Sequence, residues 1–238
     1  MGVTGDSSRP VAELLQQSYF CILPTSTVYC PGQSYQGKAE ELRQVNAFLQ
    51  EQDIHRLALV VASSIGADLA TAFLAQTALP VEHVWFDGGQ FAQIRPGLRH
   101  VMTPFVYLAI KSLYWSRGKT LKHILWCDDP AIRPYFIAAG KHLTYRNLRR
   151  QLSDSLEDKP FPPLSPDLQA RTFWAFGSKE DHFQYRDAVR RAYPHGQFPV
   201  FDRYDHMQYQ IQDPQGFAAL LDRVITQGVP PQLPMLRF

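Results

Sequence analysis

The sequence predicts an α/β fold: a mainly parallel sheet with helices on both faces and an inserted helical block. Two observations carry this prediction. Short apolar runs alternate with amphipathic segments along the chain, an order typical of parallel sheets. The alternation is interrupted between residues 91 and 159, where helical periodicity continues without a clear strand. The 238 residues therefore divide into a core, residues 1–90 and 160–238, and an insertion, residues 91–159.

The expected strands are apolar runs, most of them closed by a residue that turns or breaks the chain. Continuous runs of this kind are typical of strands that are buried on both faces. In chain order they are Tyr19–Leu23, Leu57–Ala62, Val81–Phe86, Ala170–Phe176 and Phe198–Phe201. We expect these strands to pair in this order.

The expected helices show apolar residues at intervals of three and four. They are Pro10–Gln17, Lys38–Gln52, a helix from Ala67, Val101–Trp115, a segment from Pro130 towards Ala139, Thr144–Leu156, Asp187–Tyr193 and Gly216–Val224. The tail from Val229 to Phe238 contains three prolines, so we expect it to be extended or frayed.

Composition and charge give no reason to expect a nucleic-acid partner. The net charge is only +2, and the densest basic run, Arg146–Arg150, fits a solvated helix face. The cysteines Cys21, Cys30 and Cys127 are odd in number and lack metal-ligand spacing, which favours reduced thiols in the cytoplasm. No signal core or membrane-length apolar run is present, so we expect a cytoplasmic protein without a membrane partner.

A sharp turn at Ser64 joins the apolar run Leu57–Ala62 to helical spacing that begins at Ala67. Ser64 has a small residue two positions before it, Ala62, and another two positions after it, Gly66. Such neighbours suit a strained strand-to-helix turn, because bulky side chains would collide across it. The Ser64 hydroxyl would then lie at a helix N-terminus, where the dipole and free N–H groups favour a developing anion.

Two other interpretations of this turn remain open. Ser63 could occupy the tip, although it fits worse because the bulky Ile65 lies two positions after it. The turn could also be an ordinary strand-to-helix connection that a serine caps.

The stretch from Ala62 to Gly66 resembles the Gly-x-Ser-x-Gly motif of the α/β-hydrolase family, with alanine at the first glycine position. The resemblance implies a catalytic triad in the chain order serine, acid, histidine, with Ser64 as the nucleophile. It also implies that the helical insertion is the family's lid. The resemblance covers most of the chain.

The acid and the histidine are placed by the same resemblance. After the strand Ala170–Phe176, the turn from Gly177 is similar to the family's Gly-x-x-Asp and puts Glu180 at the acid position. Asp181 and Asp87 are the alternative acids. After the last expected strand, His206 occupies the place of the catalytic base.

The first residues of the chain resemble a loop that, in the family, follows the third strand. Met1–Gly5 is similar to the loop that supplies one oxyanion-hole N–H, with Met1 in place of the histidine. This implies Ile65 and Val3 as the oxyanion donors and suggests a chain that is shortened at its N-terminus. A missing neighbour beside Leu57–Ala62 would leave an exposed sheet edge that favours self-association.

The implied function is a serine hydrolase that cleaves a carboxylic ester through an acyl-enzyme and needs no metal or other cofactor. Aromatic residues of the insertion, among them Phe105 and Trp115, favour a small apolar substrate. A thioesterase, peptidase, C–C hydrolase or acyltransferase would use the same triad. A catalytically impaired binding or interaction protein on the same scaffold is the alternative from another class.

Overall fold

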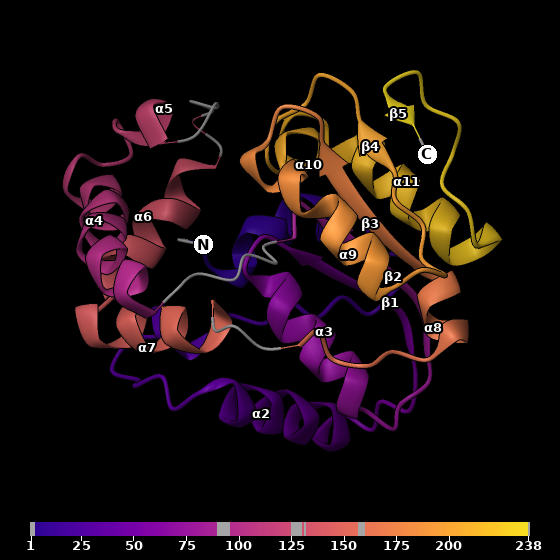
Figure 1. Ribbon diagram of the computed structural model, residues 1–238, viewed down its shortest axis with the longest axis horizontal. Coiled ribbons are helices and arrows are strands. Elements are labelled where there is room, and N and C mark those ends of the chain that lie inside the picture. Colours follow the sequence, from indigo (N-terminus) through magenta and orange to yellow (C-terminus); the bar gives the residue numbers. More distant parts are fainter. Residues whose placement is uncertain (1–2, 90–95, 125–129, 131, 157–159, 238) are drawn as a thin grey trace. The chain divides into compact units, whose positions relative to one another are not determined.

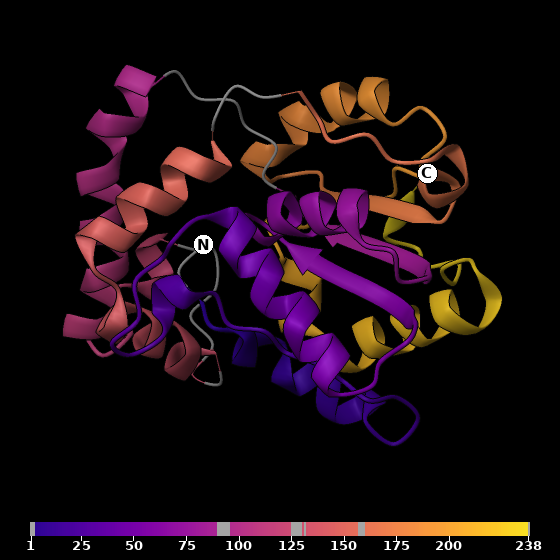
Figure 2. The same cartoon turned by 90° about the horizontal axis from the view of Figure 1, so that it is seen from below.

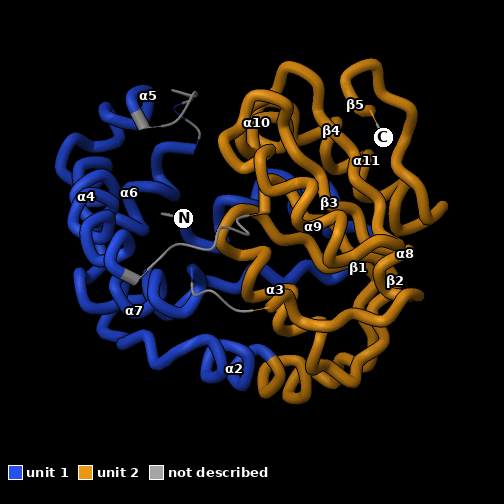
Figure 3. The backbone as a smooth tube through the Cα atoms, in the orientation of Figure 1, with its two compact units in different colours: residues 1–45, 93–158 blue, residues 46–92, 159–238 orange. Residues whose placement is uncertain are grey.

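The computed structural model describes residues 3–89, 96–124, 130, 132–156 and 160–237 (Figure 1). The chain groups into two compact units (Figure 3). Unit 1 consists of residues 1–45 and 93–158, and unit 2 consists of residues 46–92 and 159–238. Helix α2 (Lys38–Glu51) contains residues of both units.

Unit 2 contains a five-stranded sheet. Its strands are β1 (Leu57–Ser63), β2 (Val81–Asp87), β3 (Thr172–Gly177), β4 (Val200–Phe201) and β5 (Leu236–Arg237), paired in that order. The first four strands are parallel, and β5 is antiparallel to β4. The predicted mainly parallel α/β sheet is therefore confirmed.

Helices cover both faces of this sheet (Figures 1 and 2). They are α3 (Gly66–Gln76), α8 (Pro166–Ala170), α9 (Arg186–Ala192), α10 (Gln208–Gln212) and α11 (Pro214–Gln227), with a short 3-10 helix η3 (Asp181–Tyr185).

Aromatic side chains that alternate along the central strands explain why both faces are buried. On one face Trp85 stacks on Phe173 at 5.4 Å and meets Phe217 of α11 edge-on at 6.4 Å. On the other face Trp174 stacks on Tyr193, at the end of α9, at 5.0 Å. Because successive strand residues point to opposite faces, neighbouring residues of β3 bury aromatic surface on both sides.

One prediction about strands is wrong. Tyr19–Leu23 forms no strand, and the side chain of Phe20 is 74% exposed. An apolar run becomes a strand only where its backbone pairs with another segment, and periodicity carries no information about that pairing. The expected extended tail has a pairing that the sequence did not predict, because Leu236 and Arg237 pair with Phe201 and Val200 as β5.

Unit 1 is helical in its described residues. Its elements are η1 (Gly5–Ser8), α1 (Arg9–Leu15), η2 (Thr27–Tyr29), the first part of α2, α4 (Pro96–Trp115), α5 (Leu121–Ile124), α6 (Arg133–His142) and α7 (Tyr145–Ser155). Helix α4 packs against α6 and α7. A Cβ on Gly140 of α6 would lie 2.8 Å from the Ile110 carbonyl oxygen, so this glycine permits the close approach of α4.

Residues 1–45 belong to the helical unit, whereas the sequence assigned them to the core. Side-chain hydrogen bonds explain the grouping. Asn147 of α7 accepts from the Tyr35 N–H at 3.2 Å and donates to the Gln33 carbonyl at 3.0 Å. Asp154 accepts from the Lys38 N–H at 2.9 Å. These bonds join positions more than 100 residues apart, and only the tertiary structure reveals them.

The basic run lies beside a surface hollow of about 600 Å³ in unit 1. Arg146 and Arg149 are exposed, as expected for a solvated helix face, and Arg150 donates to the Tyr35 carbonyl at 3.0 Å. Among the cysteines, Cys21 and Cys30 are free thiols, and Cys127 lies outside the described residues. The helices in the described part of the chain are too short or too polar to span a membrane.

Candidate active site

Four loops of unit 2 meet at the carboxyl edge of the parallel strands. Ser64 follows β1, Gly88 follows β2, Glu180 follows β3 and His206 follows β4. The strand register places Ser63 opposite Asp87 and Gly177 opposite Phe201, so these strand ends lie level with one another. Ligands of α/β sheets bind at this edge.

Ser64 has the strained backbone that the sequence predicts for the turn after β1. Its φ is +54°, in the left-handed region, which costs a non-glycine residue about 1–2 kcal/mol. The Ser64 N–H donates to the Asp87 carbonyl at 3.2 Å, and the Ser64 carbonyl accepts from the Ala67 N–H at 3.1 Å. Ser63 has a different environment, because its hydroxyl accepts from the Gln210 side chain at 3.1 Å.

The structure does not support the expectation that a side chain at the position of Gly66 would collide across the turn. A Cβ on Gly66 would meet no described atom within 4 Å beyond its chain neighbours and its own helix backbone. The glycine opens α3, and a side chain there would face open space.

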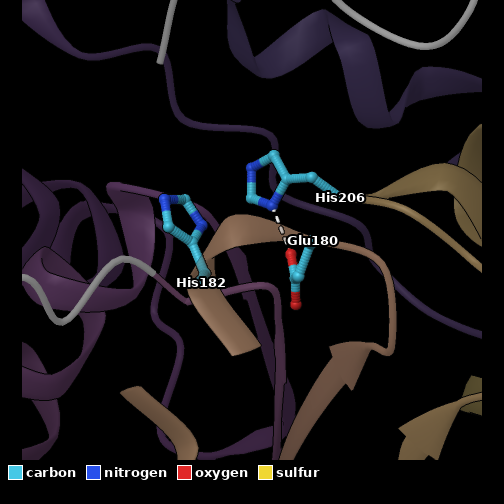
Figure 4. A group of neighbouring side chains, drawn as sticks. All are labelled: Glu180, His182 and His206. Atoms are coloured by element: carbon cyan, nitrogen blue, oxygen red, sulfur yellow. Dashed lines mark hydrogen bonds and ion pairs between the residues drawn. The ribbon is translucent and has the colours of Figure 1, made fainter. Parts of the chain in front are cut away.

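Glu180 and His206 are hydrogen-bonded. The Glu180 Oε2 lies 2.6 Å from the His206 Nδ1, and the Glu180 side chain is fully buried (Figure 4). The other carboxyl oxygen accepts from the Gly177 N–H at 2.9 Å. A carboxyl group bonded to Nδ1 orients the ring and leaves Nε2 for a reacting group.

The acid turn and the histidine loop are fixed to each other. The Lys179 N–H donates to the Tyr204 carbonyl at 3.0 Å, and the Arg203 N–H donates to the Ser178 hydroxyl at 2.8 Å. A Cβ on Gly177 would lie only 2.5 Å from the Tyr204 carbonyl oxygen. The glycine at the start of the acid turn is therefore required for the close approach of the two loops.

Gly88 lies directly against the Glu180–His206 pair. A Cβ at this position would come within 2.5 Å of both Glu180 Oε2 and His206 Nδ1, and the φ of Gly88 is +58°. Gly88 follows Asp87, whose carbonyl binds the Ser64 N–H. The Asp87–Gly88 turn therefore connects the serine backbone to the acid–histidine pair.

The two alternative acids have different surroundings. Asp181 is exposed at the start of η3. Asp87 is buried at the end of β2, and no described residue binds its Oδ2. Burial first, and then the neighbouring Glu180 carboxyl, raise the pKa of Asp87 well above its usual range.

Burial also disfavours charge on the Glu180–His206 pair. It raises the pKa of Glu180 to about 8 and lowers the pKa of His206 to about 4. Burial therefore favours the uncharged form of each group. When Glu180 is ionised it accepts from the protonated Nδ1, and Nε2 can then accept a proton from a nucleophile.

His182 is part of the site and was missed by the sequence reasoning. Its Nδ1 donates to the Gly88 carbonyl at 3.2 Å, and its ring centroid lies 4.6 Å from that of His206. Its only sequence signal is its place two residues after Glu180. Donor atoms of Glu180, His182 and His206 lie within 4.8 Å of one another, so a divalent metal could bind there if it replaced the hydrogen bonds (Figure 4).

The two proposed oxyanion donors lie in different units. Ile65 is the N-cap residue of α3, and no described residue accepts a hydrogen bond from its N–H. Val3 belongs to unit 1, so its role as the second donor stays a prediction. The Ser64–His206 hydrogen bond also stays a prediction.

Solved structures resemble the chain over most of its length. An α/β-hydrolase family protein from Desulfitobacterium hafniense has a TM-score of 0.68 and 14% identity, over 94% of this chain and 92% of that one. A thermophilic esterase from Thermogutta terrifontis has a TM-score of 0.66 and 14% identity, with coverage of 94% and 87%. MenH from S. aureus has a TM-score of 0.66 and 12% identity, with coverage of 92% and 88%.

These likenesses show that the chain has the α/β-hydrolase fold. No protein-family model and no curated protein sequence matches the chain. The fold suggested by the sequence motifs is thus confirmed, whereas the reaction has to be argued from the site.

Proposed function

We propose that the chain is a serine hydrolase that cleaves carboxylic esters, with Ser64 as nucleophile, His206 as base and Glu180 as acid. The observation that carries the proposal is the 2.6 Å bond between Glu180 and His206, at the same sheet edge as the left-handed Ser64. Hydrolases and esterases among the structures of the same fold support the reaction class. The order serine, acid, histidine fits that of α/β-hydrolases.

The proposed reaction requires that His206 Nδ1 carry the proton shared with Glu180, which leaves Nε2 to accept another. His206 Nε2 takes the proton of the Ser64 hydroxyl as the oxygen attacks the ester carbonyl carbon. The Ile65 N–H donates to the oxyanion of the tetrahedral intermediate. Its collapse breaks the ester bond, and the leaving alkoxide takes the proton from His206. Water, deprotonated by His206, then attacks the acyl-enzyme and releases the carboxylic acid and the serine.

The proposed substrate is a small ester with an apolar group. Helix α4 exposes large apolar side chains, with Phe105 70% and Trp115 62% exposed, and such surface suits an apolar acyl or alcohol group. We propose that the helical insertion acts as a lid that contributes this surface. Thioesters offer the same carbonyl chemistry, so they are the natural comparison substrates.

A fluorophosphonate probe tests the nucleophile directly. We expect it to label wild-type protein and Ser63→Ala, and to leave Ser64→Ala unlabelled. Labelling of Ser64→Ala, or none of the wild type, would contradict the proposal. The latter result would favour the binding-protein alternative.

The acid is tested with single substitutions and a p-nitrophenyl ester. Loss of the group that orients the base costs about 10⁴-fold in kcat in serine hydrolases. We expect a loss of this order for Glu180→Ala and smaller losses for Asp181→Ala and Asp87→Ala. If Asp87→Ala or Asp181→Ala abolishes turnover and Glu180→Ala does not, the assignment of the acid is wrong.

A further inference from the structure

His182 is a half-buried side chain that the proposed mechanism does not use. It lies in η3, two residues after Glu180, and contacts groups from the two loops after β2 and β4. We propose that His182 is a positioning residue that holds the His206 ring in the orientation required of the catalytic base. The inference rests on the proposed function, because it requires that His206 be the base.

The first contact fixes the turn beneath the pair. His182 Nδ1 donates to the Gly88 carbonyl at 3.2 Å, while the Gly88 N–H donates to the Ala175 carbonyl at 2.9 Å. Hydrogen bonds therefore hold both the carbonyl and the N–H of Gly88. Since its α-carbon lies directly against Glu180 Oε2 and His206 Nδ1, a movement of this turn would displace the acid–base pair.

The second contact is with the base itself. The rings of His182 and His206 are perpendicular, at 88°, with centroids 4.6 Å apart (Figure 4). This packing restricts rotation of the His206 ring and keeps water from one side of it. A displacement of about 1 Å in a catalytic group can cost about a hundredfold in rate.

The charge of His182 is compatible with this role. Burial lowers its pKa to about 4, so it is neutral at pH 7 and places no positive charge beside the base. Among the described residues of unit 2, the titratable groups that face His206 are Glu180 from the acid turn, His182 and Asp181 from η3, and Asp205 from its own loop. Asp87 of β2 faces Glu180.

Three substitutions separate the two contacts. His182→Asn keeps an N–H donor for the Gly88 carbonyl but removes the ring. His182→Phe keeps a ring beside His206 but removes the donor, and His182→Ala removes both. His195→Ala is the matched control, because His195 is an exposed histidine in the same unit.

Steady-state hydrolysis of a p-nitrophenyl ester between pH 5 and 10 gives the readout. We expect kcat to fall about 10- to 100-fold in His182→Ala with little change in KM, and to recover partly in His182→Asn and in His182→Phe. Loss of the ring admits water to the pair, so the rising limb of the pH profile should move to lower pH in His182→Ala and His182→Asn. In His182→Phe it should stay in place.

Two results would overturn the proposal. In one, His182→Ala has the kcat and pH profile of His195→Ala. In the other, the three variants lose kcat in proportion to their melting temperature while the pH midpoint stays fixed, which would make the role only structural. Failure of wild-type protein to react with fluorophosphonate would overturn the proposed function as well, and the two failures are thereby distinguished.

Discussion

Replacement of Gly88 by alanine tests whether the turn after β2 governs the acid–histidine pair. The new Cβ would lie 2.5 Å from Glu180 Oε2 and from His206 Nδ1, whereas ordinary contact begins at 3.4 Å. The pair must therefore retreat by about 3.4 − 2.5 = 0.9 Å, which corresponds to about a hundredfold loss of rate. The left-handed φ of +58° also costs alanine about 1 kcal/mol.

Gly228→Ala is the matched control for the free-energy cost of placing alanine at a left-handed φ. Gly228 has a φ of +72°, and the nearest atom to its new Cβ would be His83 Cε1 at 3.5 Å. Gly228→Ala should lose about 1 kcal/mol of stability, seen as a melting-temperature decrease of about 2–4 °C, and Gly88→Ala should lose at least as much because its Cβ also displaces the pair. Only Gly88→Ala should lose ester hydrolysis and fluorophosphonate labelling.

The outcome that would refute this reasoning is specific. If Gly88→Ala hydrolyses a p-nitrophenyl ester within about threefold of Gly228→Ala, the pair tolerates a displacement that should cost about a hundredfold. Gly88 would then have no part in positioning the base. If both variants lose the same fraction of activity, the loss comes from backbone strain at positive φ and not from contact with the acid–histidine pair.

The remaining predictions concern pH and the sheet edge. Labelling of Ser64 should increase with pH with a midpoint near 8, because the base requires ionised Glu180; a flat rate from pH 5 to 9 would contradict this. The buried histidines should contribute a loss of stability in acid. Burial lowers the pKa values of His182 and His206 to about 4, so these side chains bind more protons in the unfolded chain below about pH 6.5, and their contribution to stability is lost as pH falls towards 4, while the raised pKa values of Glu180 and Asp87 act in the opposite direction. The free energy of urea unfolding of His182→Asn, relative to that of wild type, should therefore be higher at pH 4 than at pH 7, and an equal difference at both pH values would count against it. Val61 is 41% exposed on β1, the first strand in the sheet order. Val61→Lys should therefore reduce any self-association seen in sedimentation experiments. A sedimentation mass equal to that of wild type would exclude β1 as the site of self-association.

Local chemistry explains what the sequence by itself determined. The runs that became β2 and β3 are mostly buried, as their apolar composition predicts, whereas no residue of β1 is fully buried. The parallel pairing of β1 to β4 fits the order of the apolar runs along the chain. The turn at Ser64 and the spacing from Gly177 to Glu180 are short-range features. Sequence reasoning could therefore place Ser64, Glu180 and His206 each after its strand, and their joint action stays a prediction.

Contacts between distant segments decided the rest. Tyr19–Leu23 has the composition of a strand but forms none, and the end of the tail pairs with β4. The grouping of residues 1–45 with the helical unit depends on bonds such as Tyr35 to Asn147. The contacts of His182 and Gly88 with the acid–histidine pair join loops far apart in sequence. Periodicity and motif spacing report only on neighbours along the chain, so they carry no information about such contacts.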